Sequence, residues 1–194
     1  AAMRTERHGP AYRRIVRRLG RDGWLGVGWP TKYGGKGFGE IEQQIFTNEA
    51  VRADVPLPAV TLQTVGPTLQ TYGTDEQKAM IDGSITGKYR ITFGLTEPDH
   101  GSDATHMETK AVQATRDNVK GWIINGEKMW TTGMHVATHC ALFARTSGND
   151  GDARGISCFL VPAKSPGVKV EEYMWTFNMP TDHPRVSFTD VFVP

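Results

Sequence analysis

A turn-rich stretch, residues 91–103, gathers hydroxyl, carboxylate and imidazole side chains directly after a short apolar run. Ser102, His100 and Asp103 first suggest a Ser-His-Asp hydrolase. These residues are nearly adjacent, however, whereas the partners of a catalytic triad usually converge from distant segments. The frame around Ser102, His100 to Ala104, contains one glycine only, Gly101, and so does not match a G-x-S-x-G nucleophile elbow. The hydrolase interpretation is therefore disfavoured.

The same stretch can instead form a ligand-binding turn. Thr96 and Ser102 offer hydroxyl groups, Gly101 allows close approach to the backbone, and Pro98 stiffens the chain. Such a turn suits a phosphate group or the edge of a heteroaromatic ring. The alternative is a loop stabilised only by its own Ser and Asp side chains, which is a common use of these residues.

A second stretch, INGEKMWTTG, also combines a turn signal with groups that can bind a ligand. Asn125 and Gly126 predict a two-residue hairpin turn. The strand expected beyond it carries Trp130, Thr131 and Thr132. An indole plane there could pack on a planar cofactor while a threonine hydroxyl bonds a ring nitrogen. Trp and Thr are also ordinary strand residues, so this stretch alone leaves both interpretations open.

Up to residue 89 the apolar residues recur with helical spacing. Gly66-Pro67 must kink or divide the third predicted helix, and Thr74 with Gln77 forms a capping box at the start of the fourth. The glycine-rich segment 23–39 fits neither a phosphate loop nor a dinucleotide fingerprint and is predicted to be a packed connector. The predicted helical segments are 12–24, 40–54, 60–73 and 74–87; the second has its apolar repeat at Ile41, Ile45, Phe46 and Ala50.

After residue 90 the apolar period becomes two and turns become frequent. Short strands bounded by turns at this density predict an antiparallel β-barrel or sandwich. The predicted fold class is therefore α+β, with an all-helical domain over residues 1–89 followed by an all-β domain over residues 90–194. The strand-like segments are 90–95, 108–115, 119–126, 138–145, 156–162, 168–173 and 185–193.

Composition argues against several functional classes. The net charge of +1 argues against a dedicated nucleic-acid surface. No apolar run approaches the roughly 20 residues of a membrane helix. Cys140 and Cys158 lie in apolar runs and predict buried free thiols. His135 and His139 lack the Glu of the HExxH motif, so a zinc site is disfavoured.

Jointly, LTEPDHGSD, INGEKMWTTG and VSFTDVFVP, in this order and spacing, resemble the acyl-CoA dehydrogenase family of flavoproteins. The segments GWLGVGWPTKYGGKGFG and YGTDEQK resemble the helical domain of that family. The resemblance covers nearly the whole chain, and the motifs are specific only when taken together.

The resemblance implies that the β-domain supports the isoalloxazine ring of FAD. The segment from Phe93 to Thr96 would bond the pyrimidine edge of the ring, largely through its backbone and the Thr96 hydroxyl. Ser102 would lie near the flavin pyrophosphate and the pantetheine arm of the substrate. Trp130 would pack on the ring and the Thr132 hydroxyl would lie at flavin N5, while Thr131 would contribute only backbone. The implied cofactor-binding residues are Phe93, Gly94, Leu95, Thr96, Gly101, Ser102, Trp130, Thr131 and Thr132.

The implied reaction is α,β-dehydrogenation of an acyl-CoA thioester to the 2-enoyl-CoA, as in fatty-acid β-oxidation. A carboxylate removes the α-proton while a hydride moves to flavin N5, with stacking supplying orientation. Electrons would leave to an electron-transfer flavoprotein or another acceptor. We expect a homo-oligomer, dimer or tetramer, in the cytoplasm or, in a eukaryote, the mitochondrial matrix. The alternatives are an acyl-CoA oxidase, a flavin monooxygenase on the same scaffold, or a non-catalytic binding module ending at residue 194.

Two stretches depart from the family pattern. Asp99 and His100 stand where Gly and Ala are usual; His100 could contact phosphate or pantetheine, but we expect it to point to solvent. Residues 178–188, NMPTDHPRVSF, replace an Arg-x-Ser-Asp-Thr pattern, so this loop is expected to contact cofactor or substrate differently. Both departures leave the acyl group unassigned.

The chain stops at DVFVP, where the family continues into a C-terminal helical domain that carries the catalytic Glu. No carboxylate of this chain matches that base, because Glu97 matches a turn residue. We therefore expect a fragment without the C-terminal helical bundle, which alone is inactive and binds FAD weakly.

Overall fold

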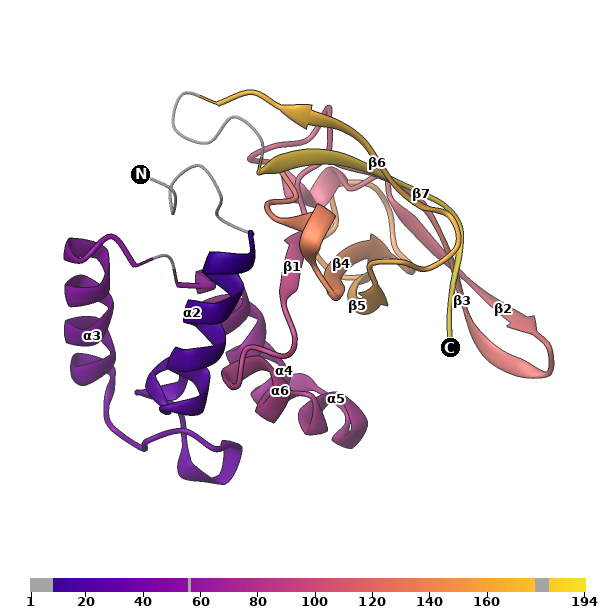
Figure 1. Cartoon of the computed structure of the whole chain (residues 1–194). Coiled ribbons are helices and arrows are strands. Elements are labelled where there is room, and N and C mark those ends of the chain that lie inside the picture. The colour runs from indigo at the N-terminus through magenta and orange to yellow at the C-terminus, as the bar shows by residue number, and fades with distance from the viewer. Residues whose placement is uncertain (1–8, 56, 177–181) are drawn as a thin grey trace. The chain divides into compact units, whose positions relative to one another are not determined.

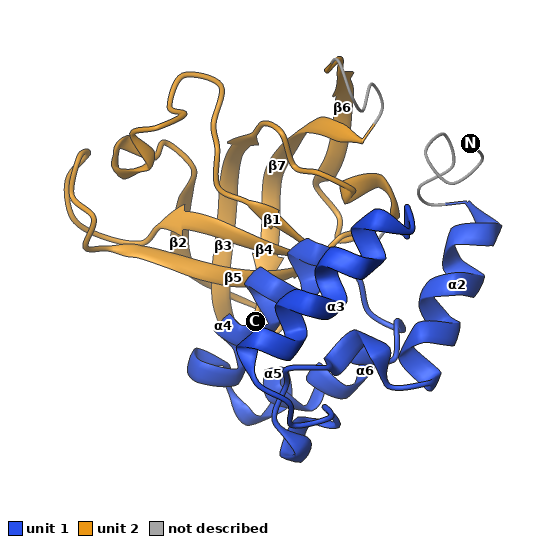
Figure 2. Cartoon of the chain, turned by 90° about the vertical axis from the view of Figure 1, so that its left-hand side faces the viewer, with its two compact units in different colours: residues 1–90 blue, residues 91–194 orange. Residues whose placement is uncertain are grey.

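The computed structural model describes residues 9–55, 57–176 and 182–194. The chain divides into two compact units, residues 1–90 and residues 91–194. Figure 1 shows that the first unit is built from helices and the second from strands, and Figure 2 distinguishes the two by colour. The predicted order, helical and then β, is confirmed.

The α-helices of unit 1 fall in the predicted segments, except that α2 begins at Pro10, and two short 3₁₀ helices lie in the glycine-rich connector. Gly66-Pro67 divides the third segment, since a short π-helical turn ends at Val65 and an α-helix begins at Gly66. The capping box is also present: the Gln77 N–H donates to the Thr74 hydroxyl at 3.3 Å, and the Gln77 side chain accepts from the Thr74 N–H at 3.0 Å. The elements are α2 (Pro10–Arg21), η1 (Trp24–Gly26), η2 (Thr31–Tyr33), α3 (Glu40–Arg52), η3 (Val60–Val65), α4 (Gly66–Tyr72), α5 (Asp75–Ala79) and α6 (Ile81–Ile85).

Burial in unit 1 agrees with the sequence in the connector and disagrees in α3. Leu25, Val27 and Trp29 are buried, as expected for a packed connector. Ile41 and Ile45 belong to the apolar repeat from which this helix was predicted, but they are 75% and 57% exposed. The helix itself is present, as α3, so the repeat predicted the element but not the burial of these two residues.

Unit 2 is a single seven-stranded sheet, and all seven predicted strands are confirmed. The strands follow the order β1-β4-β2-β3-β7-β6, and β5 pairs with β4. Most pairs are antiparallel, but β1 joins β4 in parallel. Figure 2 shows the strands curling around one side of the unit. Their bounds are β1 (Ile91–Gly94), β2 (Lys110–Arg116), β3 (Val119–Lys128), β4 (His139–Arg145), β5 (Ile156–Pro162), β6 (Val168–Met174) and β7 (His183–Val193).

The hairpin predicted at Asn125-Gly126 is wrong. The turn between β2 and β3 is formed by Asp117 and Asn118, both with positive φ (49° and 63°), as a tight hairpin turn requires. Asn125 and Gly126 lie inside β3, at an irregularity in its pairing with β7. Gly126 has φ +152°, and a Cβ there would lie 2.6 Å from the Thr109 Cα. The glycine therefore serves close approach of two backbones rather than a turn.

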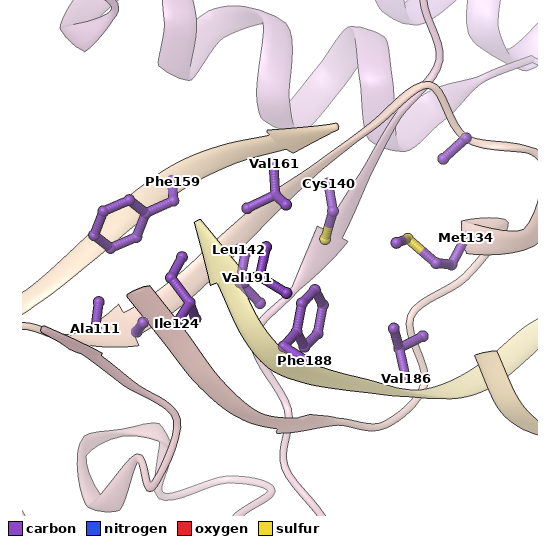
Figure 3. Packing of buried hydrophobic residues seen from close by; sticks show 12 residues of the cluster. Ala111, Ile124, Met134, Cys140, Leu142, Phe159, Val161, Val186, Phe188 and Val191 are labelled. Atoms are coloured by element: carbon purple, nitrogen blue, oxygen red, sulfur yellow. The ribbon is translucent and has the colours of Figure 1, made fainter. Parts of the chain in front are cut away.

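The hydrophobic core of unit 2 lies on the inner face of the curled sheet. Figure 3 shows Leu142, Phe188 and Val191 packed together, with Cys140 and Met134 nearby. Cys140 is fully buried as predicted, whereas Cys158 on β5 is exposed. The prediction for Cys158 is wrong because β5 pairs with β4 alone, and Cys158 alternates with the buried Phe159 along that strand.

The described residues contain no helix that is both long and apolar enough to cross a membrane. They also contain no group of three or more His, Cys, Asp or Glu side chains placed to hold a metal ion.

Candidate functional site

The predicted ligand-binding turn begins where β1 ends. Phe93 and Gly94 are the last residues of β1, and the chain continues through Leu95 and Thr96 into the turn. The Thr96 carbonyl accepts a hydrogen bond of 2.8 Å from the Met129 N–H. This bond brings the start of the turn beside the segment that follows β3.

A buried ion pair holds the turn in place. The Lys128 Nζ atom lies 2.8 Å from Glu97 Oε1 and also donates a 3.1 Å hydrogen bond to the Leu95 carbonyl. The two side chains are only 0% and 4% exposed. Charges buried this deeply require partners and further hydrogen bonds. The pair therefore fixes both the course of the turn and the Leu95 carbonyl.

The Glu97 carboxylate is fully occupied by the protein. Besides Lys128, it accepts hydrogen bonds from the Glu108 N–H at 2.7 Å and the Thr109 N–H at 2.9 Å. Burial alone would raise the pKa of Glu97, but the bonds from Lys128, Thr109 and Glu108 outweigh it and hold the pKa below its ordinary value. Burial lowers the pKa of Lys128, against the opposing effect of Glu97. Glu97 is thus a structural group rather than a free base.

The far end of the turn is open. Gly101 and Ser102 are exposed, and a Cβ at Gly101 would meet nothing within 4 Å, so the chain itself does not require glycine there. Asp103 accepts a 3.2 Å hydrogen bond from the Thr105 N–H and starts the short 3₁₀ helix η4 (Ala104–His106). Among the described residues, no hydrogen bond joins Gly101 or Ser102 to the segment after β3.

His100 does not point into solvent. Its Nε2 atom lies 3.1 Å from Glu108 Oε1, its ring stacks on His106 at 5.9 Å, and its side chain is 24% exposed. The expectation of a solvent-facing ring is therefore wrong. Glu108 follows the turn closely in sequence, and its carboxylate contacts the His100 ring and holds it against the protein.

Trp130 lies in a loop rather than in the strand predicted for it. β3 ends at Lys128, and the loop runs from Met129 to the 3₁₀ helix η5 (Met134–Val136). Trp130 has φ +56°, a left-handed conformation that costs a bulky residue roughly 1–2 kcal/mol. Its side chain is still 43% exposed. A strained backbone that presents a large aromatic plane to the outside is typical of functional sites.

The two threonines after Trp130 lie against the start of β7. The Thr131 N–H donates to the Pro184 carbonyl at 3.1 Å, and the Gly133 N–H donates to the Asp182 carbonyl at 2.7 Å. Thr131 is fully buried, and its hydroxyl has no partner among the described residues. These two backbone bonds flank Thr132 and hold it opposite the first residue of β7.

The Thr132 hydroxyl contacts His183. The distance from Thr132 Oγ1 to His183 Nδ1 is 2.8 Å, and the hydroxyl lies 3.3 Å from the Trp130 carbonyl. The Thr132 carbonyl accepts from the Thr92 hydroxyl of β1. The loop is therefore tied both to β1, which leads into the turn, and to β7.

The structure brings together some of the predicted residues but not all of them. The β1 end and the Trp130 loop are joined by direct hydrogen bonds, whereas Gly101 and Ser102 lie at the open end of the turn. Sequence reasoning missed Glu97, Lys128 and His183 as members of the arrangement. A signal for Lys128 did exist: it lies at strand spacing from the buried Ile124, so its side chain had to face inward and find a carboxylate.

A hollow of about 640 Å³ opens beside the turn, but residues other than the predicted set line it. Its walls include Pro98, Asp99 and His100 from the turn and Arg185 and Ser187 from β7. None of the nine residues predicted to bind the cofactor lines this hollow.

The groups around the Trp130 loop are compatible with a planar heteroaromatic ligand such as a flavin ring. Trp130 offers an exposed indole plane and Thr132 a hydroxyl that can donate or accept. Thr96 is half-buried, and its hydroxyl has no hydrogen bond to another described residue. An aromatic plane beside two hydroxyl groups provides both stacking and polar recognition of ring edges.

Comparison with known proteins gives consistent results for both units. The acyl-CoA dehydrogenase N-terminal domain matches residues 1–85, and the acyl-CoA dehydrogenase middle domain matches residues 92–191. Acyl-CoA dehydrogenase FadE29 of Mycobacterium tuberculosis (strain ATCC 25618 / H37Rv) is 51% identical over 175 residues, which cover 90% of this chain and 43% of that protein.

Solved structures agree with this result. The ChsE4-ChsE5 complex from Mycobacterium tuberculosis matches with a TM-score of 0.88 and 36% identity, over 100% of this chain and 50% of that one. The Tcur3481-Tcur3483 steroid ACAD matches with a TM-score of 0.86 and 37% identity, over 96% of this chain and 47% of that one. The chain spans about half the length of the relatives it matches.

Proposed function

Since the chain belongs to the acyl-CoA dehydrogenase family, we propose that the whole protein carries out FAD-dependent α,β-dehydrogenation of an acyl-CoA thioester to the 2-enoyl-CoA. The activity is proposed for the whole protein because the chain spans about half the length of its relatives. One observation carries the proposal: the loop with the exposed, left-handed Trp130 and the Thr132 hydroxyl is tied to β1 and the turn after it, through the Thr132 carbonyl and the Met129 N–H.

In this proposal each part of the arrangement has a role. The Trp130 indole packs against the isoalloxazine ring, and the Thr132 hydroxyl lies at N5. The backbone from Phe93 to Leu95, with the Thr96 hydroxyl, bonds the pyrimidine edge. FAD supplies the acceptor for the substrate hydride. The protein contributes a fixed orientation of ring and substrate, which is a large part of catalysis when two reactants must meet in one geometry.

The open end of the turn, at Gly101 and Ser102, is proposed to bind polar parts of the cofactor or substrate. Ser102 is exposed, so its hydroxyl is available to the flavin pyrophosphate or to the pantetheine arm of the substrate. Gly101 leaves the backbone beside it accessible. Thr131 takes part through its backbone only, because its side chain is fully buried.

The base that removes the α-proton is not assigned to a carboxylate of the turn. Glu97 is held by Lys128 and by two backbone N–H groups, and its pKa is lowered by those bonds, so it is a poor proton acceptor. We therefore do not assign the base to Glu97, and we expect this chain on its own to be inactive.

The substrate class is proposed from the relatives. The steroid ACAD Tcur3481-Tcur3483 is 37% identical to this chain, so a CoA thioester carrying a steroid is one candidate. A straight- or branched-chain fatty acyl-CoA, as in β-oxidation, is the other. Electrons are proposed to pass to an electron-transfer flavoprotein or a comparable acceptor.

The assembly is proposed to be oligomeric. A homodimer or homotetramer was expected from the family, while the match to the ChsE4-ChsE5 complex adds assembly with a related second chain as an alternative. Measuring the mass of the whole protein expressed alone, and together with a related chain, separates the two arrangements.

The test is anaerobic bleaching of the flavin. The whole protein loaded with FAD is mixed with steroid and fatty acyl-CoA thioesters, and absorbance of the oxidised flavin is followed. We expect bleaching by at least one saturated thioester and formation of the 2-enoyl product. No bleaching by any member of either class would contradict the dehydrogenase assignment. Rapid oxygen consumption during aerobic turnover would indicate an oxidase instead.

A further inference from the structure

The Thr132 hydroxyl lies between two partners that differ in what they can do. The Trp130 carbonyl, at 3.3 Å, can only accept a hydrogen bond. His183 Nδ1, at 2.8 Å, donates in one tautomer of the ring and accepts in the other. The backbone bonds on either side hold Thr132, in the loop after β3, opposite His183 at the start of β7.

Whether His183 Nδ1 carries a proton therefore decides whether the Thr132 hydroxyl can donate a hydrogen bond to a third group. When Nδ1 carries a proton, it donates to Thr132 Oγ1, and the hydroxyl proton can point to a third group. When Nδ1 carries none, it takes the hydroxyl proton, and Thr132 then only accepts. A hydroxyl has one proton to give, so the two arrangements exclude each other.

We propose that His183 is a positioning residue of the flavin site, acting through Thr132. The inference rests on the function proposed above. N5 of oxidised flavin accepts a hydrogen bond, whereas N5 of reduced flavin carries a proton and donates one. With Nδ1 protonated, His183 directs the hydroxyl proton toward oxidised N5. Toward a reduced flavin the hydroxyl would instead accept from N5 and donate its own proton to the Trp130 carbonyl.

The charged residues next to His183 along the chain are Asp182, which is buried and directly precedes β7, and Arg185 on β7. Arg185 has its own carboxylate partners, Glu127 at 3.1 Å and Glu172 at 3.0 Å. On β6, the residue paired with His183 is the uncharged Met174. The half-buried imidazole is thus the group that selects the direction of the Thr132 hydroxyl.

A double-mutant cycle on FAD affinity and flavin midpoint potential tests the inference in the whole protein. His183→Ala is expected to weaken FAD binding about fivefold, the effect of one ordinary hydrogen bond, and to shift the midpoint potential. Thr132→Val is expected to weaken binding at least as much. Because His183 acts through the hydroxyl, His183→Ala in the Thr132→Val background should cause no further change in either quantity.

Two further variants keep the test independent of misfolding. His183→Asn retains a short side chain that can donate or accept, so it should restore most of the affinity lost in His183→Ala. His135→Asn makes the same substitution at an exposed histidine of η5 and should leave affinity and potential unchanged. Nitrogen NMR of the oxidised, FAD-loaded protein should show His183 Nδ1 protonated.

The outcomes separate the two proposals. If wild-type protein does not bind FAD, the proposed function fails and the inference fails with it. If FAD binds but the His183 and Thr132 effects are additive, or Nδ1 is unprotonated in the oxidised protein, the inference alone is overturned.

Discussion

The turn after β1 and the loop after β3 meet at the same place but are held in opposite ways. The turn is fixed by the buried Glu97–Lys128 pair, whose groups also bond the Leu95 carbonyl and the Glu108 and Thr109 N–H groups. The loop carries an exposed indole on a strained backbone and a hydroxyl whose partner can donate or accept. The turn is thus a rigid support, whereas the loop is the part that remains open to a ligand.

This contrast assigns stability and exposure to different parts of one small sheet. A buried charge pair contributes little net stability compared with an apolar core, but breaking it is costly, so it fixes one arrangement. A strained residue is tolerated only where its surroundings determine it, here by hydrogen bonds to β1 and β7 on either side. Substitutions in the turn should therefore affect stability, and substitutions in the loop should affect binding.

The largest effect is expected at Lys128. Lys128→Met leaves the Glu97 carboxylate buried without its cation and should lower the free energy of unfolding by about 3–5 kcal/mol. Urea denaturation, followed by hydrogen exchange of amide groups in unit 2, measures this change. Adding Glu97→Gln to Lys128→Met removes the second charge and should recover part of the loss. A double variant less stable than the single one would contradict a buried ion pair.

A smaller effect with a distinct pH dependence is expected at Glu97. At pH 7, Glu97→Gln should cost about 1.5–3 kcal/mol, since it weakens hydrogen bonds to a charged group. The pKa of Glu97 is lower folded than unfolded, so its stabilisation is complete above the ordinary Glu pKa of about 4.3 and is lost as pH falls through the folded value. The stability gap between wild type and variant should therefore narrow below about pH 4.

The control for this pH experiment is Glu108→Gln, because the Glu108 side chain is 71% exposed. It should change the free energy of unfolding by no more than about 0.5 kcal/mol at any pH. A Glu97→Gln gap that stays constant from pH 7 to pH 3 would mean that Glu97 does not titrate as a paired carboxylate.

The backbone strain in the loop can be measured by a matched pair of substitutions. Trp130→Gly and Trp130→Ala both remove the indole and differ only in the Cβ atom. At φ +56° the glycine variant should be more stable by about 0.5–1 kcal/mol, because relief of left-handed strain exceeds the entropy cost of glycine. Thermal or urea unfolding measures the difference. An alanine variant at least as stable as the glycine variant would show that no strain is stored there.

The sequence predicted the strands well because alternation and turn residues are local signals. It failed at Asn125-Gly126, where a strong hairpin signal marks a bulge, since close approach to Thr109 requires glycine there. At Ile41 and Ile45 the helical repeat correctly predicted a helix, but both side chains are exposed. Periodicity reveals which side is apolar, but not what packs against it.

The candidate site was predictable only in part. Trp130 and Thr132 were identified from the motif, yet the residues that position them came from the tertiary structure. Lys128 and Glu97 are 31 positions apart, and His183 and Thr132 are 51 positions apart. No local pattern couples residues at such separations. The pairing of β3 with β7, and the hydrogen bond from Met129 to Thr96, bring them together.

The central claim, that the Trp130 loop binds the flavin, is tested most directly by FAD affinity. The dissociation constant of FAD is compared among the whole wild-type protein and its Trp130→Ala and Trp175→Ala variants. Trp175→Ala is the control, because it removes another exposed indole (79% exposed). We expect Trp130→Ala to weaken FAD binding at least about tenfold, in line with the loss of one aromatic contact. The Trp175→Ala variant should bind FAD as tightly as the wild type. Equal affinity of the Trp130→Ala variant and wild type would contradict it.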